Sequence, residues 1–146
     1  MAGRRQCDEM SCLVPELIVS DIEASLAFYR LLGFQVRYAR PEERFAYLER
    51  GGAEIMLEQP TGRCWLTGPM EAPYGRGINF QIDVDDVDTL YAAVQGAAAP
   101  IVLPIEEKWY RCGDELAGQR QFIVQDPDGY LLRFCQPLGS KPAAIS

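Results

Sequence analysis

The fold is decided by a stretch that occurs twice, first as Leu17-Ile-Val-Ser-Asp-Ile-Glu-Ala-Ser-Leu26 and again as Ile82-Asp-Val-Asp-Asp-Val-Asp-Thr-Leu-Tyr91. Each copy begins with a short alternating run typical of a β-strand and continues with apolar residues at helical spacing. Between the two parts lies an aspartate, Asp21 or Asp86, at the position of a helix N-cap. An internal repeat of this kind predicts two copies of one small structural unit.

Strand signals follow each predicted helix, over residues 34–40, 44–49 and 54–58 and then over 101–104, 121–125 and 130–135. Gly51-Gly52 and Asp126-Pro-Asp-Gly129 predict tight turns before the last strand of each half. Aligning Gly52 with Gly129 also aligns Gln59-Pro60 with Gln136-Pro137, so the repeat covers the whole unit. We therefore predict an α+β fold in which two tandem βαβββ units form a curled, cup-shaped mixed sheet with the helices outside.

The unit boundaries follow from the composition of the segments between the strands. We expect a single domain over residues 13–137, made of repeat one (13–60), a linker rich in glycine and proline (61–76) and repeat two (77–137). The ends of the chain lack such patterns, so we expect a flexible N-terminal arm over residues 1–12 and a C-terminal tail over 138–146.

Charge and composition exclude several classes of function. The net charge is −7, which repels nucleic acid and anionic membranes but attracts cationic small molecules. The chain contains no histidine, the commonest metal ligand and general base, so histidine-based metal sites and catalytic triads are impossible. We find neither a transmembrane run nor a secretory signal and expect a cytoplasmic protein.

The cysteines give a weaker indication. Their number is odd and their spacing is irregular, with no CxxC pair, at Cys7, Cys12, Cys64, Cys112 and Cys135. In a chain without a signal sequence this favours reduced thiols over a disulfide framework. A zinc site at Cys7 and Cys12 is the alternative.

Two longer motifs carry a family resemblance. They are Val19-Ser-Asp-Ile-Glu-Ala-Ser-Leu-Ala-Phe-Tyr29 followed by Leu32-Gly-Phe34, and Gln121-Phe-Ile-Val-Gln-Asp-Pro-Asp-Gly-Tyr-Leu-Leu-Arg-Phe134. Both resemble the glyoxalase/bleomycin resistance protein/dioxygenase superfamily, also called the vicinal oxygen chelate superfamily. The resemblance implies paired βαβββ modules whose sheets curl into a cup. In many members that cup holds a divalent metal that binds vicinal oxygens of a substrate.

The resemblance also indicates where metal ligands would lie. The positions are Val14 and Asn79, seven residues before each capping aspartate, and Met56 and Arg133, four residues after each turn glycine. Metal-binding members have mostly histidine and glutamate there, whereas valine cannot ligate and arginine adds a positive charge. We therefore predict no metal and no other cofactor, and reject a metal-dependent glyoxalase or dioxygenase.

What remains is similar to the metal-free, bleomycin-resistance branch of the superfamily. The resemblance to that branch implies a binding protein that sequesters a cationic, partly aromatic drug in a groove formed by a homodimer. It also implies an N-terminal strand exchanged between subunits, and Val14-Pro15 is similar to the start of that strand.

Strand alternation predicts which side chains line the cup. On the side away from the helices it places the carboxylates of Glu16, Glu54, Glu58 and Asp83, opposed by Arg133. Aromatic residues in the connecting segments add candidates, because exposed tryptophan often stacks on a flat or cationic ligand. The predicted ligand-binding residues, with Trp109 foremost, are Trp109, Tyr110, Trp65, Phe45, Tyr47, Glu16, Met56, Glu58, Asn79 and Arg133.

Three hypotheses follow, and the sequence leaves all three open. The first is a dimeric protein that sequesters a cationic or aromatic small molecule, such as an antibiotic, without catalysis. The second is a metal-free lyase or other enzyme of the same fold, in which a cup carboxylate with a raised pKa is the general base. The third is a structural or regulatory module whose own side chains fill the cup.

Overall fold

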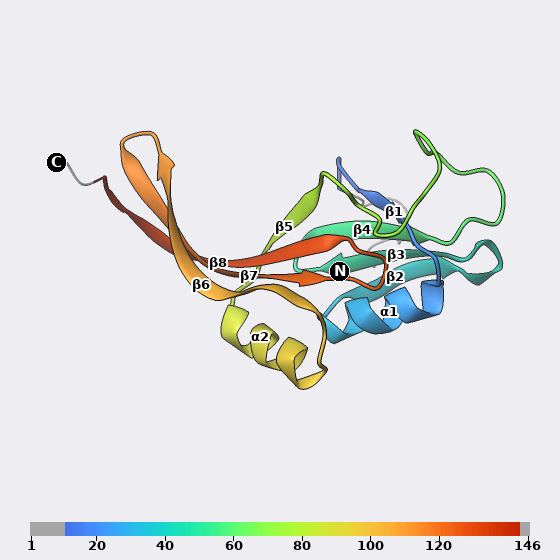
Figure 1. Cartoon of the computed structure of the whole chain (residues 1–146), viewed down its shortest axis with the longest axis horizontal. Helices are drawn as coiled ribbons and strands as arrows, with labels where there is room; N and C mark the ends of the chain where they lie inside the picture. The colour runs from blue at the N-terminus through green and yellow to red at the C-terminus, as the bar shows by residue number, and fades with distance from the viewer. Residues whose placement is uncertain (1–10, 144–146) are drawn as a thin grey trace, which may run out of the picture. The chain divides into compact units, whose positions relative to one another are not determined.

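The computed structural model describes residues 11–143, which divide into two units at the Ala72–Pro73 bond. Each unit has one helix on one face of its own four-stranded sheet (Figure 1). Neither of the two helices within residues 11–143 has the length and apolar run that a bilayer crossing requires.

The first unit follows the order strand, helix, three strands. Its elements are β1 (Glu16–Ile18), α1 (Ile22–Leu31), β2 (Gln35–Arg40), a short 3-10 turn (Pro41–Glu43), β3 (Phe45–Arg50) and β4 (Ala53–Glu58). The strands lie in the order β1-β4-β3-β2, with β1 parallel to β4 and the other pairs antiparallel.

The second unit repeats this order. Its elements are β5 (Asn79–Asp83), α2 (Val87–Gly96), β6 (Ile101–Cys112), β7 (Glu115–Gln125) and β8 (Leu131–Pro142). The strands lie in the order β5-β8-β7-β6, again with one parallel pair, β5 with β8. The prediction of an α+β fold built from two tandem βαβββ units is therefore confirmed.

The two units agree in register as well as in topology. Glu16 pairs with Met56 across the parallel strands of the first unit, and Gln81 pairs with Arg133 in the second. These are the pairs that the sequence repeat predicts when Met56 is aligned with Arg133. The equivalence of the two positions is thus a property of the backbone and not only of the alignment.

Both helices begin as the repeat predicts. The Asp21 side chain accepts hydrogen bonds from the backbone N–H groups of Glu23 and Ala24, and Asp86 accepts one from Thr89. These bonds satisfy N–H groups that have no partner within the helix. The pKa of Asp86 is held below its ordinary value, first by the Thr89 side chain and then by its backbone N–H.

Each helix packs an apolar stripe onto its sheet. In the first unit Tyr29 is fully buried and meets Phe28 and Phe34 edge to face. In the second unit Phe122 stacks on Phe134, and both rings are fully buried. Burying side chains of this size supplies most of the free energy that holds each helix on its sheet.

Two predicted boundaries were wrong. β6 continues past residue 104 to Cys112, and β8 continues past residue 135 to Pro142, so residues 138–142 are strand and not a loose tail. The turn at Gly113-Asp114, where Gly113 has φ +64°, joins β6 to β7 and lets the three strands extend together beyond the helix (Figure 1). The start of the predicted N-terminal arm, including Cys7, and the last residues of the predicted tail, 144–146, lie outside the described part of the chain.

Candidate functional site

The side of the first sheet away from α1 carries half of the predicted site residues. Leu17, Ile55 and Leu57 face the helix, so the alternate positions point the other way. These positions are Glu16 and Ile18 on β1, Phe45 and Tyr47 on β3, and Glu54, Met56 and Glu58 on β4. We call this surface the first open face.

An aromatic floor lies at its centre. Tyr38 stacks on Tyr47 with ring centroids 5.2 Å apart and meets Phe45 at 6.0 Å. Tyr47 is fully buried and Phe45 only 4% exposed, whereas Tyr38 is half-buried. The two predicted residues therefore form the base of the face, and Tyr38 presents its ring at the surface.

A β-bulge explains why the sequence did not reveal Tyr38. The register of β2 against β3 shifts between Val36 and Tyr38, leaving Arg37 as an extra residue. Strict alternation would put Arg37 and Tyr38 on opposite faces. In the structure the Arg37 guanidinium lies 5.2 Å from the Tyr47 ring centroid, so both side chains belong to the first open face.

Arg37 also holds a buried carboxylate. Its side chain pairs with Glu54 and lies 3.6 Å from Glu49, and the side chains of Arg37 and Glu54 are only 11% and 5% exposed. The backbone N–H of Ser11 donates a second hydrogen bond to Glu54 at 2.8 Å. Burial alone would raise the pKa of Glu54, but the hydrogen bonds led by Ser11 and the charge of Arg37 outweigh it and hold that pKa below its ordinary value.

Glu16 and Glu58 form a pair of a different kind at the edge of the same face. On the neighbouring parallel strands, Glu16 lies opposite Met56 and Ile18 lies opposite Glu58. Glu16 and Glu58 are therefore diagonal neighbours on the same face. Burial, the hydrogen bond with Glu58 and the Glu58 charge together raise the pKa of Glu16, and Arg40 opposes the rise only partly. Two acids that share a hydrogen bond have lost part of their hydration and favour a cationic partner.

The side of the second sheet away from α2 is more polar. Its parallel strands present Asn79, Gln81 and Asp83 on β5 and Leu131, Arg133 and Cys135 on β8. We call this surface the second open face. One terminal nitrogen of Arg133 donates to Gln81 Oε1 at 2.9 Å. Burial raises the pKa of the Cys135 thiol, which keeps it protonated and unreactive.

Tyr110 belongs to the second open face, but Trp109 does not. The Tyr110 hydroxyl accepts a hydrogen bond from Gln121 at 2.8 Å. Trp109 precedes Tyr110 on β6 and lies on the α2 side of the sheet. Its ring contacts Gly118, and the Lys141 ammonium lies 4.0 Å from the ring centroid. The expectation that this pair lies in a connecting loop was wrong, and the strand that holds the two residues turns their side chains to opposite faces.

Trp65 lies outside the strands that form the first open face. It follows β4 in the non-repetitive segment, is 72% exposed and has the Arg63 guanidinium 4.2 Å from its ring centroid. The structure therefore groups Glu16, Phe45, Tyr47, Met56 and Glu58 in the first unit and Tyr110, Asn79 and Arg133 in the second, and leaves out the two tryptophans.

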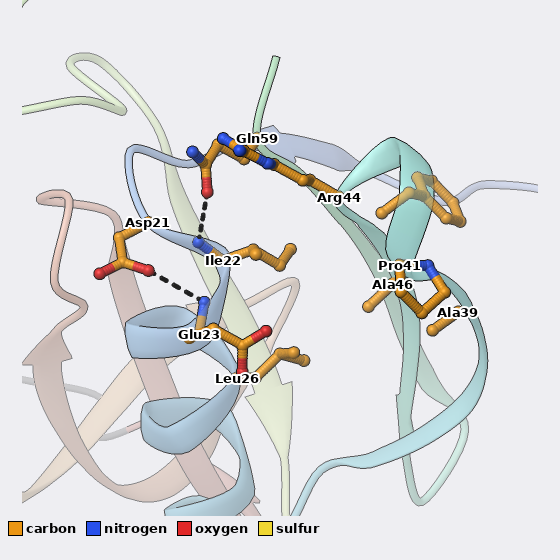
Figure 2. A pocket seen from close by; sticks show the side chains of 10 residues that line it. Asp21, Ile22, Glu23, Leu26, Ala39, Pro41, Arg44, Ala46 and Gln59 are labelled. Carbon is orange, nitrogen blue, oxygen red and sulfur yellow. Dashed lines mark hydrogen bonds between the residues drawn. The ribbon is translucent and has the colours of Figure 1, made fainter. Parts of the chain in front are cut away.

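A cavity that the sequence did not suggest lies beside the start of α1 (Figure 2). It has a volume of about 420 Å³ and is bordered by acidic side chains at the helix start and by Arg44 across from them. Gln59 Oε1 accepts from the Ile22 N–H at 3.0 Å within its wall. Its residues are Asp21, Ile22, Glu23, Leu26, Ala39, Pro41, Arg44, Phe45, Ala46 and Gln59, and Phe45 is the one predicted site residue among them.

Comparison with known proteins agrees with this architecture. Residues 12–134 match the family described as the Glyoxalase/Bleomycin resistance protein/Dioxygenase superfamily. The chain belongs to this superfamily.

Individual members cover nearly the whole chain. Proteins called "Bleomycin resistance protein" from Geobacillus stearothermophilus and Staphylococcus aureus are each 28% identical over 87% of this chain and 97% of their own length. TioX from Micromonospora sp. ML1 is 28% identical over 88% of this chain and 100% of its own, with a TM-score of 0.64. A superfamily member from Vibrio splendidus 12B01 is 46% identical over 86% of this chain and 97% of its own length, with a TM-score of 0.42.

The superfamily's metal does not fit the residues of this chain. At the four ligand positions stand Val14, Met56, Asn79 and Arg133, which together offer one amide oxygen, one thioether sulfur that suits only soft metals, and a guanidinium. Within residues 11–143 no group of three or more aspartate, glutamate, cysteine or histidine side chains is placed to hold a metal ion. The four cysteines of that range, Cys12, Cys64, Cys112 and Cys135, are free thiols.

Proposed function

We propose that this chain is a metal-independent small-molecule-binding protein of the bleomycin-resistance type, which sequesters a cationic or aromatic ligand, such as an antibiotic, in the cytoplasm. The observation that carries the proposal is the first open face, where the Glu16–Glu58 pair borders an aromatic floor. The 28% identity to bleomycin resistance proteins over nearly the whole chain supports it.

The chemistry of the face selects a flat cation. A cation placed between Glu16 and Glu58 compensates the burial and the charge repulsion that raise the pKa of Glu16. An aromatic body attached to that cation stacks on Tyr38, whose ring is supported from below by Tyr47. Met56, opposite Glu16 and two residues before Glu58 on β4, adds an adaptable apolar contact.

Binding without reaction is the simpler assignment for this site. Glu54 is ion-paired with Arg37 and accepts a hydrogen bond from Ser11, and the thiol of Cys135 has a raised pKa. The protein then acts by lowering the free concentration of its ligand, and the ligand leaves unchanged.

Isothermal titration tests this function with bleomycin and with benzamidine, a small flat cation. We expect saturable binding of both, weakened on the order of tenfold in Glu16→Gln/Glu58→Gln, because charge-assisted contacts are lost. Glu115→Gln, an exposed glutamate of β7, removes one charge in the second unit and is the control. Equal affinity in the double variant and the wild type contradicts the proposed site, and absence of binding contradicts the function.

The proposal includes a homodimer whose groove contains the site. In the structure β1 pairs with β4 of its own chain, with Glu16 opposite Met56. A strand exchanged between subunits would make the same pairs with the partner. Size-exclusion chromatography with light scattering measures the mass, and a monomer in the presence of bleomycin contradicts the dimer.

A cysteine pair distinguishes an exchanged strand from an unexchanged one. Glu16→Cys with Met56→Cys places two thiols at a paired position, within the distance range that a disulfide spans. After oxidation, a covalent dimer on a denaturing gel indicates exchange, and a cross-linked monomer indicates that β1 stays in its own sheet. Either single variant controls for other disulfides.

A second candidate function is a metal-independent lyase or other enzyme of the same fold with Glu16 as the general base. Its raised pKa, caused first by burial, favours this role. Mass spectrometry of the bound ligand after prolonged incubation separates the two functions. A product that forms with the wild type and not with Glu16→Gln supports catalysis, and unchanged ligand supports sequestration.

A further inference from the structure

The guanidinium of Arg133 on the second open face is only partly satisfied by the described residues. Its Nε is buried and has no hydrogen-bond partner among the described residues, while one terminal nitrogen is fixed by Gln81 at 2.9 Å. No carboxylate in residues 11–143 forms an ion pair with it, although Asp83 follows Gln81 on the same side of β5. A buried donor left without an acceptor costs free energy, so this group is prepared for an acceptor that a ligand brings.

A cavity adjoins this position along the same strands. Asn79 and Leu131, which border it, form the pair next to Gln81 and Arg133 on the same face, about 7 Å along the strands. The cavity has a volume of about 370 Å³. Arg133 and Gln81 do not border it, so it offers space for a small organic body one same-face residue pair along the strands from the guanidinium.

The lining of the cavity offers no negative charge to a cationic ligand. No aspartate or glutamate borders it, although the whole chain carries 21 acidic residues against 14 basic ones. Its charged member is Arg76, whose Nε donates to Pro73 O at 3.1 Å. Its walls are Pro73, Tyr74, Gly75, Arg76, Gly77, Ile78, Asn79, Gln125, Gly129 and Leu131, which mix apolar, aromatic and amide groups.

The backbone around the cavity is rigidly built. A Cβ on Gly75 would lie 2.5 Å from the Tyr130 ring, and one on Gly129 would lie 2.6 Å from Pro73. The Tyr74 N–H donates to the Asp128 carbonyl at 2.7 Å, and the Asp126 side chain accepts from three backbone N–H groups of the same turn. The segment before β5 is thus fastened to the turn before β8, which gives the cavity a fixed shape.

We propose that Arg133 and this cavity form a second binding site, which takes a small monocarboxylate with an aromatic or apolar body. The carboxylate accepts from Arg133 Nε and from the second N–H of Nη2, the terminal nitrogen that also donates to Gln81, in the two-pronged geometry that guanidinium groups offer to carboxylates. The body of the ligand occupies the cavity beside Leu131 and Ile78. Gln81 is the positioning residue, because it fixes the plane of the guanidinium.

This site lies in the second unit and takes a ligand of opposite charge to the one proposed for the first open face. Benzoate and benzamidine are therefore a matched pair of probes that differ mainly in the sign of their charge. Failure of benzamidine to bind at Glu16 and Glu58 would remove the proposed function and leave this inference standing.

The experiment is an NMR titration of the full chain, observing the arginine Nε–H signals, with benzoate as the ligand. We expect the signal that is missing in Arg133→Met to shift saturably with benzoate and to stay in place with benzamidine. By isothermal titration, Arg133→Met weakens benzoate binding at least on the order of tenfold, and Gln81→Leu weakens it less. Arg120→Met, which removes an arginine from the α2 side of the same sheet, leaves the affinity within about twofold.

Three results overturn the proposal. They are no saturable shift of the Arg133 signal with benzoate, an equal response to benzamidine, and unchanged benzoate affinity in a folded Arg133→Met variant. The wild-type NMR titration decides the question even where Arg133→Met fails to fold, because Arg133→Lys then assigns the signal while keeping the charge.

Discussion

Gln59 and Gln136 make the same hydrogen bond in the two units. Each side-chain Oε1 accepts from the backbone N–H of the first helical residue, Ile22 or Val87, at 3.0 Å. Gln59 directly follows β4, and Gln136 lies in β8 one residue past Cys135, the last residue of β8 that pairs with β5. Each bond therefore ties the end of the parallel strand pair to the start of the helix. The repeat thus preserves a stabilising contact as well as a topology.

Loss of this contact should destabilise either unit by a similar amount. Gln59→Leu and Gln136→Leu each leave a helix N–H without its acceptor, and we expect each to lower the free energy of unfolding by about 1 kcal/mol. Urea denaturation followed by circular dichroism measures the change. Gln35→Leu, at an exposed position of β2, is the control, and a loss as large there would show that the helix bond is not responsible.

Removing Arg37 should be more severe, because it leaves the Glu54 carboxylate buried without its cation. We expect Arg37→Met to lower the free energy of unfolding by about 3 kcal/mol at neutral pH. The double variant Arg37→Met/Glu54→Met removes both charges and should recover most of that loss. A double variant as unstable as the single one would mean that packing, and not the unpaired charge, is the cause.

Acid should weaken the fold through Glu54. The pKa of Glu54 is lowered in the folded protein, so its contribution is present above the unfolded pKa of about 4.3 and is lost as the pH falls through the lower folded value. We expect the urea midpoint of the wild type to fall more between about pH 5 and pH 3 than that of Glu54→Gln. Parallel curves for the two proteins would assign the acid sensitivity to other carboxylates.

Cation binding at Glu16 should release a proton in mildly acidic solution. The pKa of Glu16 is raised above 4.5, and a bound cation favours the ionised form. Benzamidine affinity should therefore rise with pH through the raised pKa of Glu16 and level off above it. Titrations at about pH 5 in buffers of different ionisation enthalpy measure the proton release directly, and Glu16→Gln should abolish it.

Gly118 should tolerate no side chain, because Trp109 occupies the space beside it. A Cβ there would lie 2.6 Å from the indole ring, so Gly118→Ala must displace the tryptophan and should cost about 1–3 kcal/mol. Fluorescence of the variant in a Trp65→Phe background reports on Trp109 alone. Gly96→Ala, where nothing lies within 4 Å, is the control and should be neutral or slightly stabilising.

The sequence predicted the repeating architecture well because two independent signals coincide. Helical periodicity and turn glycines fix the order of the elements, and the alignment of Met56 with Arg133 reproduces the strand register. Alternation along β1, β4, β5 and β8 also placed the acids of the open faces, since those strands lack irregularities where they pair.

Prediction failed where the strands depart from strict alternation or exceed their expected length. The bulge at Arg37 cannot be read from local composition, so Tyr38 and the Arg37–Glu54 pair were missed. Trp109 and Tyr110 fell in a predicted connecting segment, because the strand signal was read only over residues 101–104. Gly113-Asp114, a dipeptide typical of two-residue hairpins, was the signal that β6 continues to it.

The confinement of strand pairing to each half of the chain has a consequence for synthesis on the ribosome. Strand pairing in the described chain stays within β1–β4 or within β5–β8, and the most distant pairing in each sheet joins its first strand to its last. Once Glu58 has left the exit tunnel, all four strands of the first sheet have emerged from the ribosome. None of the strands of the second sheet has yet emerged in full. The order of translation therefore allows the first unit to fold before its repeat exists, which removes the danger that two similar sequences exchange strands while both are unfolded.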